Sequence, residues 1–85
     1  MYVVPNNKDS DYLGVSVSKK VGKSVVRSRV SRLIKENVRL MEEDIKKGFD
    51  IVVIARVAAK DADFRDIKKS LTMLFSKHKL LSEKN

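Results

Sequence analysis

Residues 12–38 read YLGVSVSKKVGKSVVRSRVSRLIKENV, and the spacing of the hydrophobic residues changes inside this stretch. In the first part Leu13, Val15 and Val17 alternate with small or polar residues, and a period of two predicts a strand with one buried face. Gly22 interrupts the alternation. Beyond it, hydrophobic residues recur at the three- and four-residue spacing of a helix. A half-buried strand followed by an amphipathic helix predicts an α/β domain.

The predicted helix has a hydrophobic and a cationic stripe. Ser24 is expected to cap its start, and Gly48 to end it, with Lys46 and Lys47 suited to the negative end of the helix dipole. The hydrophobic stripe, which includes one asparagine, consists of Val26, Val30, Leu33, Ile34, Asn37, Val38, Met41 and Ile45. At about 100° per residue, four cations fall on the opposite face: Arg29, Arg32, Lys35 and Arg39.

The rest of the chain completes the order strand, strand, helix, strand, helix. Residues 2–4 (YVV) form a short strand before the turn signal PNN, and residues 49–56 (FDIVVIAR), hydrophobic on both faces, form an interior strand. Asp63 and Asp66 are expected to form an acidic capping box. The helix after it would bury Phe64, Ile67, Leu71, Leu74 and Phe75. The final LLSEKN is expected to fray.

This order favours a small sheet with two helices on one face and the other face open. The first two strands are expected to pair antiparallel, and a strand–helix–strand crossover would lead to the third. On the second strand, the face that carries Tyr12, Gly14, Ser16 and Ser18 is small and polar, so it leaves room for a partner to lie flat on the sheet.

The net charge of +8 is concentrated in one segment. Residues 19–39 hold eight cations and Glu36, a net +7, whereas residues 1–18 sum to −1 and residues 40–85 to +2. Such a block predicts a polyanionic partner, either nucleic acid or an anionic membrane. A solvated helix face is the plain alternative. It is disfavoured because the block holds a single neutralising anion, whereas anions are plentiful after it.

Catalytic chemistry of the chain's own is not expected. Eighty-five residues make one small domain without cysteine, and no hydrophobic run approaches the length of a membrane span. The first residues lack the pattern of a signal peptide. His78, near the end of the last helix, is interpreted as a dipole partner. Asp61, Asp63 and Asp66 are interpreted as helix-capping groups, so no catalytic or metal-binding residue is predicted.

Cations and a helix start converge in the basic segment. Lys19, Lys20 and Lys23 precede the helix, where Gly22 permits close backbone approach. The helix N-terminus adds unpaired N–H groups and positive partial charge, and arginines follow in its first turns. This combination suits the closely spaced phosphates of a folded RNA.

These residues resemble the signature of the bacterial ribonuclease P protein component. The matching positions are Lys19, Lys20, Gly22, Ser24, Val25, Arg27, Arg29, Arg32, Lys35 and Glu36. The flanking LGVSVSKK, FDIVVIAR and DIKKSLTMLF are similar too, so the resemblance covers essentially the whole chain. Two positions depart from the pattern: Ser28 replaces an asparagine, and Ser31 stands where a basic residue is common.

The resemblance implies a fold and a function. The fold would be an α/β (α+β) two-layer sandwich, ribosomal protein S5 domain 2-like, with a left-handed crossover. The chain would be the protein subunit of ribonuclease P, the endonuclease that matures the 5′ end of tRNA in the bacterial cytoplasm. The RNA subunit and substrate would hold the catalytic Mg²⁺. The partners would be ribonuclease P RNA and precursor tRNA, with no membrane.

The resemblance also assigns residues. The RNA contact would comprise Lys19, Lys20, Lys23, Arg27, Ser28, Arg29, Arg32, Lys35 and Arg39. The 5′ leader of the precursor would bind on the open sheet face, for which the candidates are Tyr2, Tyr12, Ser16, Lys68 and Lys69. Aromatic side chains suit stacking on single-stranded bases. Ordinary sheet packing is the alternative explanation for both tyrosines.

Relatives of this kind carry a helix and a short strand before the point where residues 1–85 begin. The single domain is therefore expected to expose a sheet edge, which favours dimerisation, strand exchange or weakened leader binding. Two other functions stay open: a non-enzymatic, ribosome-associated RNA-binding module, and a protein that binds membrane surfaces or acidic proteins through the basic helix.

Overall fold

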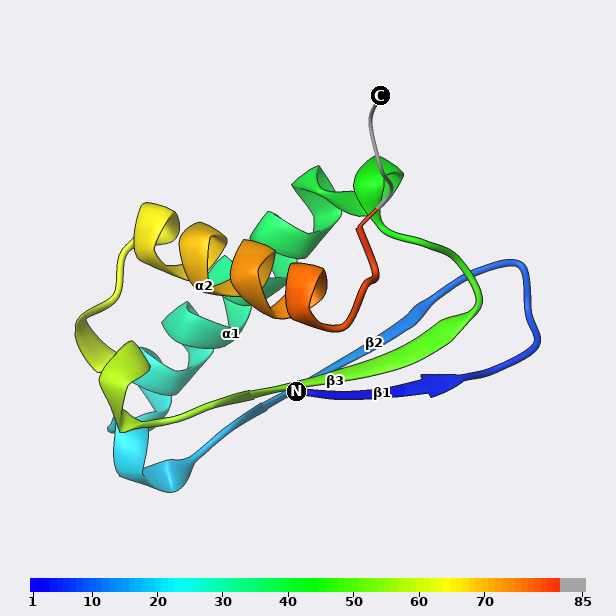
Figure 1. The fold of residues 1–85 in the computed structure, drawn as a ribbon. Coiled ribbons are helices and arrows are strands. Elements are labelled where there is room, and N and C mark those ends of the chain that lie inside the picture. The colour runs from blue at the N-terminus through cyan, green and yellow to red at the C-terminus, as the bar shows by residue number, and fades with distance from the viewer. Residues whose placement is uncertain (82–85) are drawn as a thin grey trace.

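Three strands and two α-helices form two layers (Figure 1). The computed structural model describes residues 1–81. The elements in chain order are β1 (Tyr2–Pro5), β2 (Tyr12–Val17), the 3-10 helix η1 (Lys19–Val21), α1 (Ser24–Leu40), the 3-10 helix η2 (Glu42–Asp44), β3 (Phe49–Ala55), the 3-10 helix η3 (Val57–Asp61) and α2 (Phe64–Lys77). Both α-helices cover the same face of the sheet, which confirms the predicted layer arrangement.

Strand β3 lies at the centre of the sheet, in the order β1-β3-β2. It pairs antiparallel with β1 and parallel with β2, so the predicted antiparallel pairing of the first two strands is wrong. The loop of residues 6–11 spans the roughly 10 Å between strands that flank a third. Its ends are tied to β3: Asn6 N–H donates to the Gly48 carbonyl at 2.9 Å, and Phe49 N–H donates to Asp11 Oδ1 at 2.9 Å.

The β2–α1–β3 segment is the expected crossover between parallel strands. The left-handed sense of this crossover stays a prediction from the resemblance. Within residues 1–81, β1 and β2 each have one edge with no strand partner. No helix in that range is both long enough and hydrophobic enough to cross a membrane.

The register gives the sheet two different faces. Ile51, Val53 and Ala55 of β3 are buried under the helices, and the residues paired with them face the same way. The alternate residues form what we call the open sheet face: Tyr2, Val4, Tyr12, Gly14, Ser16, Asp50, Val52 and Ile54. The alternation predicted for the second strand is therefore confirmed.

Helix α1 packs its hydrophobic stripe into the core, as predicted, with Val30, Ile34 and Asn37 buried. Its predicted ends are wrong. Lys23, not Ser24, occupies the N-cap position, and no side chain caps the helix there. The missing cap leaves the first N–H groups of α1 available to a partner.

The C-terminal end of α1 lies at Leu40 rather than near Gly48, because the chain turns into η2 after Met41. The turn brings Ile45 against the C-terminal segment, where it is buried and forms a β-bridge with Leu81. Gly48 has instead a φ of 95° just before β3, a conformation that glycine adopts at little cost.

The second helix begins as predicted, but Phe64 and Leu74 of its predicted buried stripe are only half-buried. Asp63 and Asp66 form the reciprocal capping box, and Ile67, Leu71 and Phe75 are buried. The fraying predicted for the last residues is wrong at Leu80 and Leu81. The first is 2% exposed and accepts a hydrogen bond from Lys46 N–H at 2.7 Å, and the second forms the bridge described above. Residues 82–85 lie outside the described residues.

Candidate nucleic-acid interface

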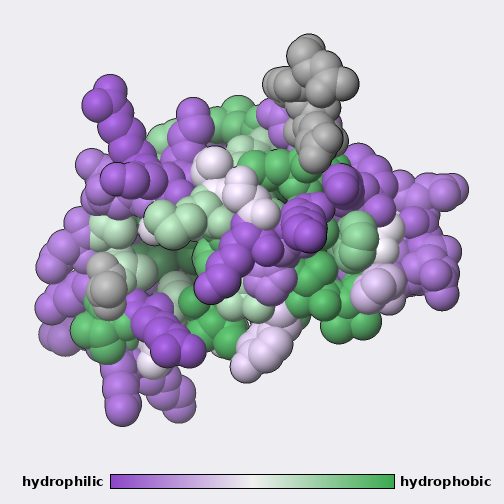
Figure 2. Space-filling view, viewed as in Figure 1, coloured by the Kyte–Doolittle hydropathy of each residue, from purple (hydrophilic) through white to green (hydrophobic). Residues whose placement is uncertain are grey.

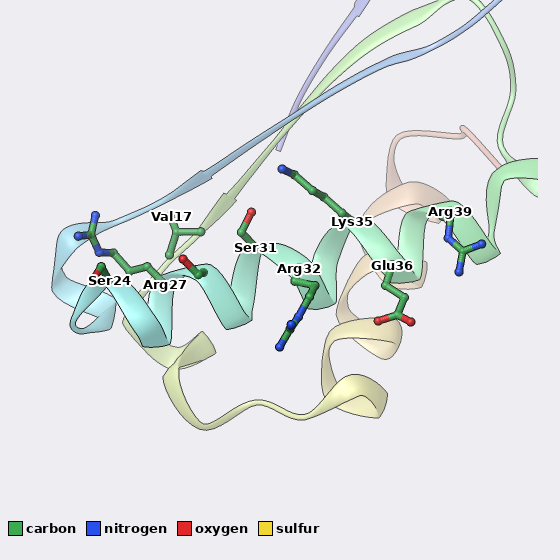
Figure 3. A pocket seen from close by; sticks show the side chains of 9 residues that line it. Val17, Ser24, Arg27, Ser31, Arg32, Lys35, Glu36 and Arg39 are labelled. Carbon is green, nitrogen blue, oxygen red and sulfur yellow. The ribbon is translucent and has the colours of Figure 1, made fainter.

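A shallow groove of about 880 Å³ runs along the outer side of α1, close to the end of β2 (Figure 3). It is lined by Val17, Ser24, Arg27, Ser28, Ser31, Arg32, Lys35, Glu36 and Arg39. In Figure 3, Ser31 and Lys35 point toward the sheet, whereas Arg32 points to the other side of the helix axis. Cations from successive turns thus stand on both sides of the groove.

Short side chains form the floor of this groove. Ser24, Ser28 and Ser31 recur at intervals of four and three residues, so one face of α1 presents three hydroxyls in its first two turns. Long cationic side chains stand on either side of them. A phosphate could therefore approach the helix backbone closely and still meet guanidinium and ammonium groups. Ser28, which departs from the family pattern that the sequence resembles, supplies one of these hydroxyls.

The described cations of this surface have no carboxylate partner among residues 1–81. Among residues 1–81, no cation of the block at 19–39 lies within 4.0 Å of a carboxylate, whereas Lys47 and Glu42, outside it, form an ion pair at 4.0 Å. Arg27 is partly buried, and its buried Nε has no hydrogen-bond partner. A buried polar atom without a partner is uncommon in folded proteins, so this part of the surface is left incomplete by the described residues.

The N-terminal end of the groove gathers the cations that precede α1. Lys19 and Lys20 are exposed on η1, and Lys23 is exposed at the uncapped start of the helix. In Figure 2, drawn in the view of Figure 1, hydrophilic side chains crowd the end of the molecule where η1 and η3 lie. The predicted meeting of connection cations with a helix N-terminus is present in the structure.

Arg29 lines a depression beside this groove together with groove residues, but its guanidinium is engaged within the chain. Its guanidinium donates to the Lys60 carbonyl at 2.7 Å and, more weakly, to the Ala62 carbonyl at 3.4 Å. Asn37, two turns further along α1, donates through Nδ2 to the Phe64 carbonyl at 3.3 Å. These two side chains fasten α1 to the junction between η3 and α2. We define the cationic face without Arg29, as Lys19, Lys20, Lys23, Arg27, Ser28, Arg32, Lys35 and Arg39.

The open sheet face brings together three of the five leader candidates. Tyr2 is 66% exposed and Tyr12 63%, and Ser16 is exposed on the same face. Cε2 of Tyr12 lies 3.5 Å from the point where a Cβ on Gly14 would stand, so its ring lies over the glycine. Exposure of this extent does not support the packing alternative for the tyrosines.

Lys68 and Lys69 are not part of that face. Both lie on α2, in the helix layer that covers the opposite side of the sheet. Arg65, which was not predicted from the sequence, lines a depression on the outside of α2 together with these two lysines. Ser24 and Ser31 were not predicted as groove residues either, although the three- and four-residue spacing of the serines indicates that they share one helix face.

Within residues 1–81, no three His, Asp or Glu side chains come together as a metal-binding group. The N–H of Asp66, donated to the Asp63 carboxylate, holds the pKa of Asp63 below its ordinary value. That carboxylate caps α2, so its lowered pKa reflects helix capping.

Comparison with known proteins shows the same family from sequence and from structure. The sequence profile described as Ribonuclease P matches residues 1–79. The ribonuclease P protein component of Clostridioides difficile is 56% identical over 75 residues, covering 87% of this chain and 66% of the relative. That of Clostridium botulinum is 53% identical over 78 residues, covering 91% and 70%. The chain thus spans about two thirds of the length of these curated relatives.

Comparison with solved structures leads to the same family. The ribonuclease P protein of Staphylococcus aureus superposes with a TM-score of 0.84 at 38% identity, covering 95% of this chain and 74% of that one. The protein of Thermotoga maritima gives 0.80 at 33% identity, covering 88% and 72%. With the family profile matched over nearly the whole chain and the same small mixed sheet under two helices, the chain belongs to the ribonuclease P protein component family.

Proposed function

We propose that this chain serves as the protein subunit of ribonuclease P, binds the catalytic RNA through the cationic face, and supports the cleavage that matures the 5′ end of tRNA. One observation carries the proposal. A row of cations without carboxylate partners among residues 1–81 borders a groove whose floor carries hydroxyl groups, at the uncapped start of a helix. The proposed location is the bacterial cytoplasm.

The chemistry of the cationic face explains how it would hold RNA. Guanidinium groups form two parallel hydrogen bonds to a phosphate, serine hydroxyls donate to the remaining oxygens, and the first N–H groups of α1 point at the anion. Each neutralised phosphate releases condensed counterions, which drives binding at low salt. These contacts would stabilise densely packed RNA that repels itself without them.

The open sheet face supports a second part of the proposal. Tyr2 and Tyr12, both exposed on this face, would stack on unpaired bases of the 5′ leader, and Ser16 would supply a hydroxyl further along β2. Lys68 and Lys69 are left out of this leader site because they lie in the helix layer. Binding substrate on one face and catalytic RNA on another would let one small chain join the two RNAs.

We propose that the RNA subunit and the substrate bind the magnesium ions, which would activate water for phosphodiester hydrolysis. The described residues of the chain present no carboxylate cluster that fits a magnesium ion, and no step is assigned to them. Their contribution is to neutralise phosphates and to hold the two RNAs in place.

Reconstitution tests the proposal. The chain is mixed with a bacterial ribonuclease P RNA and precursor tRNA at low magnesium concentration, and cleavage is followed on a gel. We expect the chain to increase cleavage, and Arg32→Gln with Lys35→Gln to reduce the increase. Tight RNA binding without any increase would contradict the proposal and favour the non-enzymatic RNA-binding module.

The membrane-binding alternative needs a hydrophobic stripe on α1 that is free to insert. That stripe is buried in the core, so the structure gives no support to this alternative. Self-association through a free strand edge stays a prediction, and sedimentation velocity measures it directly.

A further inference from the structure

Helix α2 carries a second excess of positive charge that the sum over residues 40–85 conceals. Residues 40–63 hold four cations, Lys46, Lys47, Arg56 and Lys60, against six anions, a net −2. Residues 64–79 hold five cations, Arg65, Lys68, Lys69, Lys77 and Lys79, against Asp66, a net +4. The excess outside the cationic face is therefore gathered on one helix.

Helix electrostatics account for only part of this excess. Lys77 and Lys79 lie at the C-terminal end of α2, where the dipole favours cations. Arg65 lies in the first turn, where the dipole disfavours them, and Lys69 stands four residues on, at a spacing where like charges repel. The nearby Asp66 carboxylate accepts from Asp63 N–H at 3.1 Å as part of the capping box. Within residues 1–81, no ion pair compensates these cations.

Three of these cations border a depression of about 530 Å³ on the outer surface of α2. We call its lining the α2 patch: Arg65, Lys68, Lys69, Thr72, Met73 and Ser76. Three cations and two hydroxyl groups thus surround one concave surface. Thr72 Oγ1 donates to the Lys68 carbonyl at 2.7 Å, so the donors that the patch offers to an anion are its three cations and the Ser76 hydroxyl.

We propose that the α2 patch is a second phosphate-binding surface, which contacts the RNA backbone beside the cationic face. The choice of RNA as the polyanion rests on the proposed function. The two surfaces lie on neighbouring helices of one layer (Figure 1). Arg29 and Asn37 fix α1 to the start of α2. An RNA that binds one helix therefore meets the other at a set position.

An anionic membrane is the competing partner for a basic helix. Membrane-surface helices insert a hydrophobic face beside their charges. The α2 patch offers only one large exposed hydrophobic side chain, Met73 at 62% exposure, and the hydrophobic stripe of α2 is buried. Charge complementarity without an insertable face favours a phosphate backbone.

The experiment measures the salt dependence of binding to an in vitro transcript of a bacterial ribonuclease P RNA. The test variant is Lys68→Gln with Lys69→Gln. The matched control is Lys8→Gln with Lys46→Gln, which changes the net charge equally at two exposed lysines outside both surfaces. Since glutamine is a good helix former, circular dichroism of the test variant should match the parent. Arg32→Gln with Lys35→Gln reports on the cationic face in parallel.

We expect the slope of log affinity against log salt to become shallower by about 1.4 to 1.8 units in the test variant, the value for two lost phosphate contacts, and to stay unchanged in the control. Equal changes in test and control would overturn the proposal, because net charge alone would then explain both. A change only in the Arg32 and Lys35 variant would overturn it and leave the proposed function standing. No change in any variant would overturn both.

Flotation with phosphatidylglycerol vesicles completes the test. Loss of vesicle binding in the Lys68 and Lys69 variant, with an unchanged RNA slope, would overturn the proposal in favour of a membrane. If the Lys68 and Lys69 variant binds vesicles as the parent does and has the shallower salt slope for RNA, the proposal is supported.

Discussion

At the scale of single residues, Gly22 controls how the cationic connection enters α1. Its φ of 154° and ψ of −164° lie in a region essentially restricted to glycine. A Cβ at this position would stand 3.2 Å from the Cβ of Val26, which is tighter than ordinary packing. Only glycine therefore allows Lys19, Lys20 and the start of α1 to lie as close together as they do.

We expect Gly22→Ala to lower the free energy of unfolding by about 1–3 kcal/mol, the usual cost of a non-glycine residue in such a conformation. Urea denaturation measures the change. Gly14→Ala is the control, because an added Cβ there would make only ordinary contacts, the nearest at 3.5 Å. Equal losses in the two variants would show that the conformation of Gly22 is not the cause.

A second residue-scale prediction concerns acid stability. The pKa of Asp63 is lowered in the folded chain, chiefly by the Asp66 N–H. Its contribution to stability is therefore present above the unfolded pKa of about 3.9 and is lost as the pH falls through the lower folded pKa. Asp63→Asn keeps a capping side chain but cannot titrate, so its urea midpoint should depend less on pH below about 4. An unchanged pH profile would contradict this assignment.

At the scale of elements, Arg29 and Asn37 show why a helical projection is an incomplete guide. The projection placed Arg29 with the exposed cations, but its guanidinium reaches across to the carbonyls of η3 and the residue after it. The sequence contains no signal for this contact, because the acceptors are backbone atoms more than 30 residues away. The projection did identify Asn37 as part of the buried stripe, since that position depends only on helical spacing.

Replacement by alanine is expected to affect stability at Arg29 and RNA binding at Arg32. Arg29→Ala should lower stability by about 1–2 kcal/mol, near the lower end for hydrogen bonds to a charged group because the Lys60 carbonyl is exposed. Its salt slope for RNA binding should hardly change. Arg32→Ala should leave stability nearly unchanged and flatten the slope by about 0.7–0.9 units. Urea denaturation and filter binding measure the two effects, and a reversed pattern would reassign both residues.

At the scale of the whole molecule, the cationic face dominates the charge distribution. If about six of its cations each neutralise a phosphate, log affinity for RNA should fall with log salt at a slope of about −4 to −5. Titrations between about 50 and 200 mM salt, the range where such losses are large, measure this slope. A slope near zero would show that the cationic face does not neutralise RNA phosphates.

The layer arrangement and the location of the cationic face could be predicted from the sequence, because they depend on local periodicity and on a contiguous charge block. Strand order could not, since nothing in residues 2–17 shows that β3 lies between β1 and β2. The end of α1 could not be predicted from the sequence either, because the chain after the helix packs through a bridge between Ile45 and Leu81, which are distant in the sequence.

The central position of β3 has a consequence for how the protein is made. Synthesis proceeds from the N-terminus, so β1, β2 and α1 are translated before the strand that joins them. Until Phe49–Ala55 emerges, the first two strands have no common partner and α1 has no sheet to cover. The nascent chain therefore brings its polycation to the RNA-rich surface of the ribosome before the strand that completes the sheet is available.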